Sequence, residues 1–105
     1  MVAEIHLAKI YFTDASNVKV RPILLLKLNS FNDLLYMPLT SNLNIKGISI
    51  STIDLQEGYL PKTSIVVYEK IGVISTHLLI KKIGTLEINV FKKIVNELVQ
   101  FLQNK

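Results

Sequence analysis

Residues 19–28 read K-V-R-P-I-L-L-L-K-L, and the aliphatic run within them decides the fold class. Pro22 to Leu28 is too apolar for a strand with one wet face, which predicts a central strand of a sheet. Pro22 is expected at the first position of this strand, because proline cannot donate to an interior ladder. Arg21 precedes it and is the only arginine in the chain, beside eleven lysines.

Shorter segments on both sides of this run alternate between apolar and polar residues, as half-buried strands do. The alternation is clearest in G-I-S-I-S-T-I at residues 47–53. Polar, turn-forming segments separate the strands. The expected strands are 4–12, 22–28, 34–39, 47–53, 64–68 and a short one at 71–74, joined by loops or turns at 13–19, 30–33, 42–47 and 56–62.

The last third of the chain changes period and predicts two helices. Ser75 can cap a short helix that runs to about Ile83, with Gly84 as its stop. A second helix is expected from Glu87, with an apolar stripe at spacings of three and four: Ile88, Phe91, Val95, Leu98 and Leu102. The pattern indicates a mainly β fold with C-terminal helices (α+β), in which a compact antiparallel barrel or curled sheet carries the helices.

Composition narrows the class of protein. The 105 residues suit one domain, 1–105, and half of them are hydrophobic, so some apolar surface is expected to be shared with a second copy. The longest unbroken apolar stretch is far shorter than the roughly 20 residues of a membrane span. There is no cysteine, and no secretory signal is recognisable, which together favour a cytosolic protein. The net charge of +4 is compatible with a polyanionic ligand.

Motifs for metals and nucleotide cofactors are missing from the sequence. His6 and His77 have no H-E-x-x-H or C-x-x-C setting, and no phosphate-binding glycine loop is present. We therefore expect no metal site and no cofactor.

Three features carry candidate chemistry. Arg21 offers a planar guanidinium that binds phosphate through two donors, which an ammonium group cannot do. Thr40 and Ser41 are adjacent hydroxyls at a strand end that can donate to phosphate oxygen. Glu69 follows a strand and could act as an acid or base. The alternatives for the same residues are a salt bridge, a simple turn and a solvated surface charge.

Five sequence blocks, in order, resemble those of the MazF/PemK toxin family. They are A-E-I-H (3–6), K-V-R-P-I-L-L-L (19–26), P-L-T-S (38–41), G-Y-L-P-K-T-S-I-V-V (58–67) and I-K-K-I-G-T-L (80–86). The resemblance covers essentially the whole chain. It implies an SH3-like barrel of the MazF/PemK/CcdB type that forms homodimers.

The resemblance also implies an activity and its residues. Family members are bacterial, cytoplasmic toxins of toxin–antitoxin pairs that cut single-stranded RNA, including mRNA, without metal, by 2′-OH attack on the adjacent phosphate. A small acidic antitoxin neutralises them. The family arginine falls on Arg21, its threonine and serine on Thr40 and Ser41, and its acidic position on Glu69. We further expect RNA contacts from Ser16, Lys19, Lys62 and Lys70.

The chain departs from the family pattern after the fifth predicted strand. Residues 70–75 read K-I-G-V-I-S where many members carry Q-x-R-T-I-D, so Gly72 and Ser75 replace an arginine and an aspartate. Two alternatives to an endoribonuclease therefore stay open. One is a catalytically impaired toxin-like module that binds RNA or a protein, and the other is a gyrase-poison-type toxin on the same fold.

Overall fold

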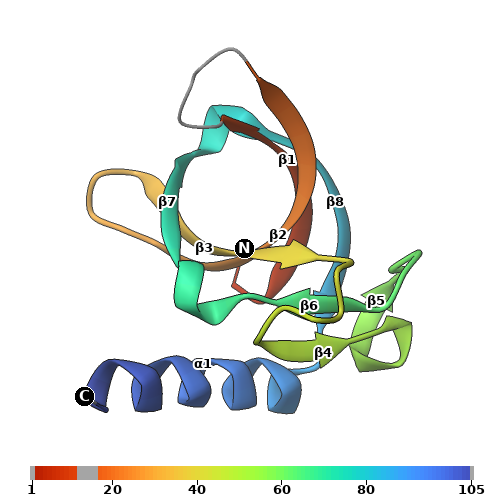
Figure 1. Cartoon of the computed structure of the whole chain (residues 1–105). Helices are drawn as coiled ribbons and strands as arrows, with labels where there is room; N and C mark the ends of the chain where they lie inside the picture. Colours follow the sequence, from red (N-terminus) through yellow and green to blue (C-terminus); the bar gives the residue numbers. More distant parts are fainter. Residues whose placement is uncertain (1, 12–16, 105) are drawn as a thin grey trace.

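The computed structural model describes residues 2–11 and 17–104, and within them it contains eight strands, three short 3₁₀ turns and one α-helix (Figure 1). The strands are β1 (Glu4–Tyr11), β2 (Val18–Leu28), β3 (Asp33–Thr40), β4 (Ile48–Ile50), β5 (Leu55–Gly58), β6 (Ser64–Val66), β7 (Gly72–Ser75) and β8 (Leu79–Leu86). The turns are η1 (Thr52–Asp54), η2 (Tyr68–Lys70) and η3 (Thr76–Leu78), and the helix is α1 (Ile88–Gln103).

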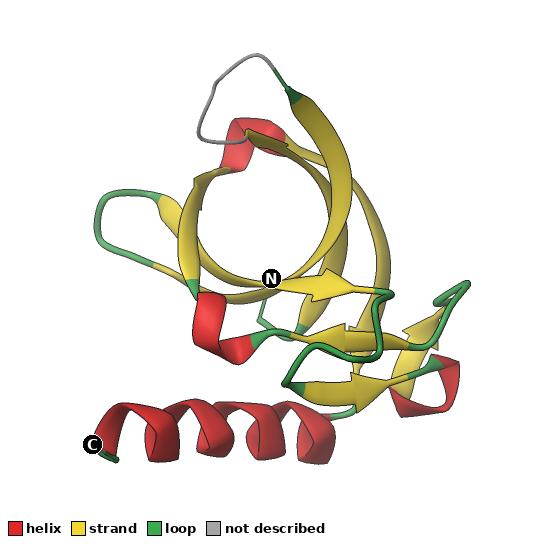
Figure 2. Cartoon of the chain, viewed as in Figure 1, coloured by secondary structure: helices red, strands yellow, loops and turns green. Residues whose placement is uncertain are grey.

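The strands form one strongly curled antiparallel sheet. The order along the sheet is β4-β6-β3-β2-β1-β8-β5, and β7 pairs with β3 off this path. The sheet curls into a barrel-like shape whose end strands are β4 and β5, and α1 lies along one end of it beneath β4 (Figures 1 and 2). This confirms the predicted mainly β fold, with one C-terminal helix where two were expected.

Strand β2 is central, as its aliphatic run predicts, and it is buried on both faces. Leu24 belongs to the larger core cluster, which includes Met37 and Ile94 of α1. Ile23 and Leu25 point to the opposite face and belong to a second cluster. All of these side chains have no exposed surface. Two apolar clusters on the two faces of one strand explain why the run lacks polar alternation.

The predicted short helix from Ser75 to Ile83 is wrong. Ser75 does cap a turn, since its hydroxyl accepts a hydrogen bond from the backbone N–H of His77 (3.2 Å), but that turn ends at Leu78. The residues that follow form β8, which pairs with β1 on one side and β5 on the other. Pairing on both sides provides hydrogen bonds for the backbone of β8, and the stability gained from this pairing outweighs the weak helix propensity of the segment.

Three strand boundaries also differ from the prediction. Pro22 is not the first residue of its strand, because β2 begins at Val18 and pairs with β1 from there. Pairing of β2 with β3 starts only at Ile23, so Pro22 lies where β2 has one neighbour, and proline is tolerated there. The predicted loop 56–62 begins within β5, and the predicted strand 47–53 ends at Ile50.

Helix α1 begins one residue after the predicted start. Phe91 and Leu98 of the predicted stripe are buried, and Val95 packs against the same core. Ile94, which the stripe omits, is fully buried. Ile88 and Leu102, by contrast, are 53% and 67% exposed.

Candidate functional site

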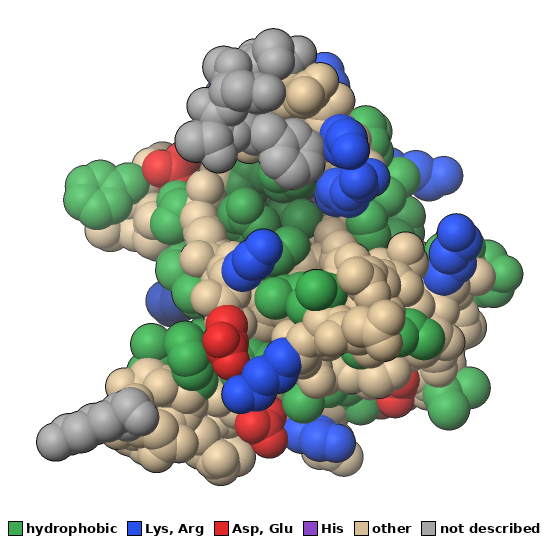
Figure 3. Space-filling model, viewed as in Figure 1, with side chains coloured by type: hydrophobic (Ala, Val, Ile, Leu, Met, Phe, Trp, Pro, Cys, Tyr) green, Lys and Arg blue, Asp and Glu red, His purple; other side chains and the backbone are tan. Residues whose placement is uncertain are grey.

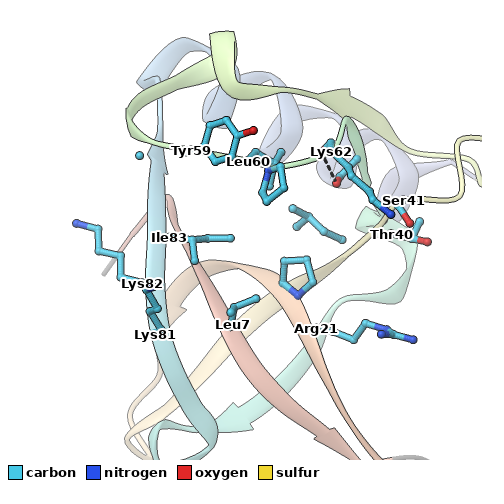
Figure 4. A pocket seen from close by; sticks show the side chains of 15 residues that line it. Leu7, Arg21, Thr40, Ser41, Tyr59, Leu60, Lys62, Lys81, Lys82 and Ile83 are labelled. Carbon is cyan, nitrogen blue, oxygen red and sulfur yellow. Dashed lines mark hydrogen bonds between the residues drawn. The ribbon is translucent and has the colours of Figure 1, made fainter.

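The sheet splits at one point, and the split creates an open hollow. Strand β3 pairs with β2 as far as Pro38 and then turns to pair with β6 through Leu39 and Thr40. Strand β2 continues through Pro22 and Arg21 toward the β1–β2 connection, paired there with β1 on its other side. The two strands therefore diverge, and the segment 59–62 between β5 and β6 lies above the gap (Figure 4). The resulting hollow has a volume of about 810 Å³.

The lining has an apolar part and a cationic part. The apolar residues are Leu7, Pro22, Leu39, Leu60, Pro61 and Ile83, with Tyr59 above them. The polar side chains are Arg21, Thr40, Ser41, Lys62, Ser64, Lys81 and Lys82. No carboxylate, carboxamide or imidazole occurs among the described residues that line it. Every charged group at the hollow is thus a cation.

Three of the four residues predicted as catalytic meet at this hollow, namely Arg21, Thr40 and Ser41. They lie on one side of it, together with Lys62, whose amino group extends toward Ser41 (Figure 4). The backbone N–H of Asn42 donates to Oγ1 of Thr40 (3.1 Å). This bond uses an acceptor position of the hydroxyl and leaves its proton free to donate to a ligand.

Within the described residues, the guanidinium of Arg21 has one hydrogen bond. It runs from Nη1 of this exposed side chain to the carbonyl of Val20 at 3.5 Å, the limit of such a bond. No carboxylate among the described residues forms an ion pair with it. The described part of the chain therefore offers no carboxylate partner for a salt bridge to this arginine, which favours an anionic ligand.

Hydrogen bonds hold the segment above the hollow in place. The carbonyl and N–H of Leu60 both bond to the hydroxyl of Thr52 (3.0 Å each). The N–H of Tyr59 donates to the carbonyl of Ile83 (3.2 Å). Gly58 enters this segment at φ 95°, where a Cβ would stand 2.3 Å from the same carbonyl oxygen, so glycine is required.

A charged network on the outer face fastens β5 to the sheet. Lys82 contacts Glu57 (2.7 Å) and Glu4 (3.6 Å), and Glu4 also bonds to Nε2 of His6 (2.8 Å). The bond from Lys82, then that from Thr85, lowers the pKa of Glu57, and the His6 bond is the main cause of a lowered pKa at Glu4. Lys82 points away from the hollow (Figure 4), so Lys81 and Lys62 are the lysines left for a ligand.

Glu69 is not brought to this hollow. It lies in η2 and forms an ion pair with Lys46 (3.3 Å), which raises the pKa of that lysine. Both residues line a second hollow of about 440 Å³, together with Glu97 and Phe101 of α1. Several acidic side chains lie toward α1 on this face of the molecule, whereas lysine and arginine side chains are spread over it (Figure 3).

The other predicted RNA contacts are dispersed. Lys62 lines the main hollow, but Lys70 lies beside Glu69 in η2, and Lys19 precedes Arg21 by two residues without lining the hollow. Ser16 lies outside the described residues. Gly72 and Ser75 lie on β7, paired with Tyr36 and Asp33 of β3, and do not line the hollow.

The sequence analysis gives no role in the site to most of the lining residues, among them Leu7, Tyr59, Lys81 and Ile83. Tyr59 stands in a segment read as a plain loop, although an aromatic side chain between Gly58 and Pro61 is a recognisable signal. Lys81 was assigned to the last turn of a helix that is in fact β8.

The described residues also lack two other kinds of site. No group of three His, Cys, Asp or Glu side chains there could hold a metal ion. No described helix is both long and apolar enough to cross a membrane.

Comparison with known proteins identifies relatives by sequence family and by fold. The family described as PemK-like, MazF-like toxin of type II toxin–antitoxin system matches residues 3–102. Among solved structures, the chain is similar to the Mycobacterium tuberculosis toxin MazF-mt6, with a TM-score of 0.65 and 20% identity over 91% of each chain. At that identity the likeness concerns the fold. No curated protein matches the sequence.

Proposed function

The chain belongs to the PemK-like, MazF-like toxin family of type II toxin–antitoxin systems, and on that basis we propose that it is an endoribonuclease toxin acting on single-stranded RNA. The observation that carries the proposal is the convergence of Arg21, Thr40 and Ser41 on one side of an open hollow. An unpaired guanidinium beside free hydroxyl donors is suited to a phosphodiester.

The proposed reaction uses a nucleophile within the substrate. The 2′ oxygen attacks the adjacent phosphorus, the bond to the 5′ oxygen breaks, and the products carry a 2′,3′-cyclic phosphate and a 5′ hydroxyl. Negative charge grows on the non-bridging oxygens, where Arg21 provides two N–H donors and Thr40 or Ser41 provides a hydroxyl. Because the attacking group is the ribose hydroxyl, no metal-activated water is needed, and we propose that the reaction is metal-independent.

Two protons must move in this reaction. The departing 5′ oxygen gains one, and the ammonium of Lys62 extends toward the same side of the hollow as Arg21 and can supply it (Figure 4). The proton of the 2′-OH passes to water, with the hydroxyl of Ser41 as a relay. Glu69 stays a prediction as a catalytic residue. Given its ion pair with Lys46, we expect Glu69→Gln to reduce the rate less than Arg21→Ala does.

A second candidate is a module that binds RNA without cutting it. The observation in its favour is that the described lining has no carboxylate or imidazole to accept the 2′-OH proton. The two candidates share the phosphate site and differ only in whether the bound RNA is cleaved.

One experiment separates them. Purified protein is mixed with single-stranded RNA in excess chelator, and the 5′ ends of the fragments are mapped. The toxin proposal expects discrete cuts that Arg21→Ala abolishes and that Lys27→Ala retains, since Lys27 is an exposed cation on the same strand outside the hollow. RNA that is bound but intact supports the binding module, and RNA that is neither bound nor cut contradicts both.

We also propose the partners that go with this function. A small acidic antitoxin would neutralise the toxin by covering the cationic, partly apolar hollow. Exposed Tyr11, Val18 and Val20 on the β1–β2 hairpin and Phe31 at the β2–β3 turn provide apolar surface for a homodimer. The toxin would act in the bacterial cytoplasm. Light scattering of the purified protein tests the dimer, and a monomer at micromolar concentration contradicts it.

A further inference from the structure

We propose that Lys81 binds a second phosphate of the same RNA strand, on the wall of the hollow opposite Arg21. The inference rests on the proposed function, because it takes single-stranded RNA as the ligand. It concerns a phosphate that neighbours the cleaved one, and therefore the path of the strand across the hollow.

The register of three strands places Lys81 on the face of the sheet that lines the hollow. Leu7 of β1 pairs with Pro22 of β2 on one side and with Lys81 of β8 on the other. Residues paired directly across antiparallel strands project to the same face. All three residues line the hollow, as this register requires. Lys81, Leu7 and Pro22 thus form one row across the sheet.

This row separates Lys81 from the first phosphate site. Neighbouring strands lie about 4.8 Å apart, so the backbones of Lys81 and Pro22 are about 10 Å from each other. Arg21 comes one residue before Pro22, and its side chain extends away from Lys81, toward the side of Thr40 (Figure 4). A phosphate bound by Arg21 on that side lies still farther from Lys81, which leaves the lysine for a neighbouring phosphate. The sugar between the two phosphates would lie over Leu7 and Pro22.

Within the part of the chain that the structure describes, Lys81 has no ionic partner, in contrast to the lysine beside it. Lys82 projects to the other face of β8, where it contacts Glu57 (2.7 Å) and Glu4 (3.6 Å). The exposed ammonium of Lys81 shares the hollow only with other cations among the charged groups of the described lining. Like charges repel one another, and a strand that brings several phosphates relieves this repulsion.

A second phosphate contact is measurable through the salt dependence of binding. Each contact between a cationic side chain and a phosphate of a single strand releases bound counterions, which contributes about 0.7 to the slope of log K against log salt. Without one contact, the loss of affinity over a tenfold rise in salt should therefore be about 5-fold smaller. At low salt, an exposed pair of an ammonium and a phosphate corresponds to an affinity difference of up to about 5-fold.

The first test measures binding without cleavage, by fluorescence anisotropy of a 2′-O-methyl RNA oligomer over a range of salt concentrations. Lys81→Met keeps most of the aliphatic stem and removes the charge, so the slope should fall by about 0.7, whereas Lys81→Arg should retain the slope of the parent. Lys27→Met is the control with the same change in net charge, at an exposed position of β2 outside the hollow. An unchanged slope in Lys81→Met, or an equal loss in Lys27→Met, overturns the proposal.

The second test locates the phosphate that Lys81 contacts. DNA oligonucleotides with a single ribonucleotide contain one cleavable phosphate, and each neighbouring linkage is replaced in turn by an uncharged methylphosphonate. At one linkage the replacement should lower kcat/KM of the parent by about 3-fold or more, and there it should have little further effect in Lys81→Met, because the two changes remove the same contact. The assignment is wrong if no linkage shows a defect, or if every defect is equally large in Lys81→Met.

The two tests keep the inference separate from the proposed function. If no oligonucleotide is cut, the cleavage proposal fails, and the salt slopes of Lys81→Met and Lys27→Met still decide whether Lys81 binds a phosphate. If the RNA is cut and Lys81→Met matches the parent in both tests, the inference fails and the proposed function stands. RNA that the parent does not bind overturns both.

Discussion

Substitution of Arg21 by lysine separates the charge of this residue from its geometry. The cation remains, but the second N–H that a guanidinium directs at a phosphate is lost. A hydrogen bond to a charged group contributes about 1.5–3 kcal/mol, so the rate of the cleavage step should fall by about 10- to 100-fold. Removal of the whole group in Arg21→Ala should lower it by about 10²–10³ or more.

The same substitution should leave the fold intact. Arg21 is exposed, and its one bond to a described residue is the 3.5 Å contact with the carbonyl of Val20, so the free energy of unfolding should change by less than about 0.5 kcal/mol. Single-turnover cleavage of a short RNA gives the rate, and urea denaturation of the same preparations gives the stability. Cleavage by Arg21→Lys at the parent rate would refute the two-donor assignment. A lower rate accompanied by a lower free energy of unfolding would show a structural effect instead.

Three further predictions concern stability and the segment above the hollow. Ile94→Ala should lower the free energy of unfolding by about 2–5 kcal/mol because Ile94 of α1 is fully buried in the main core, whereas Ile53→Ala, at an 89% exposed residue, should change it little. Similar urea midpoints for the two variants would contradict the packing. Gly58→Ala should weaken RNA binding and lower the melting temperature, because Gly58 has φ 95° and the added Cβ would stand 2.3 Å from a carbonyl oxygen. RNA binding and a melting temperature equal to those of the parent would show that the segment adapts. The pKa values of Glu4 and Glu57 lie below their ordinary value of 4.5, so the stability that these carboxylates contribute is present above that pH and is lost as the pH falls through their lower folded values. Urea midpoints measured from about pH 6 to about pH 3 should show this loss of stability. The loss should be smaller in Lys82→Met.

The local signals that predicted the fold correctly are those that pairing and burial reinforce. The run from Pro22 to Leu28 has one reasonable interpretation, because a short strand this apolar must be covered on both faces. The segment from Leu79 to Leu86 has two reasonable interpretations, the end of a helix and a strand. Its lysine pair and Gly84 suit the end of a helix, and only its neighbours β1 and β5 make it a strand.

Part of the candidate site, like part of the fold, could be predicted from the sequence. Arg21, Thr40 and Ser41 carry a distinctive chemistry at strand ends, and the divergence of β2 from β3 brings these ends to one hollow. The position of Glu69 could not be foreseen, because a single 3₁₀ turn decides that it faces α1. For a similar reason the sequence does not identify Tyr59 as a lining residue, because its place at the hollow depends on where the chain returns from β5 to β6.

The central claim is that the hollow binds a phosphodiester whose own 2′ oxygen carries out the cleavage. It is tested most directly by an RNA in which the one ribose preceding the mapped cut is replaced by 2′-deoxyribose. The account predicts that cleavage at that phosphate disappears while binding persists, and that the unmodified RNA yields a 2′,3′-cyclic phosphate by mass spectrometry. Cleavage of the deoxy substrate at the same position, with a 5′ phosphate on the fragment, would contradict it.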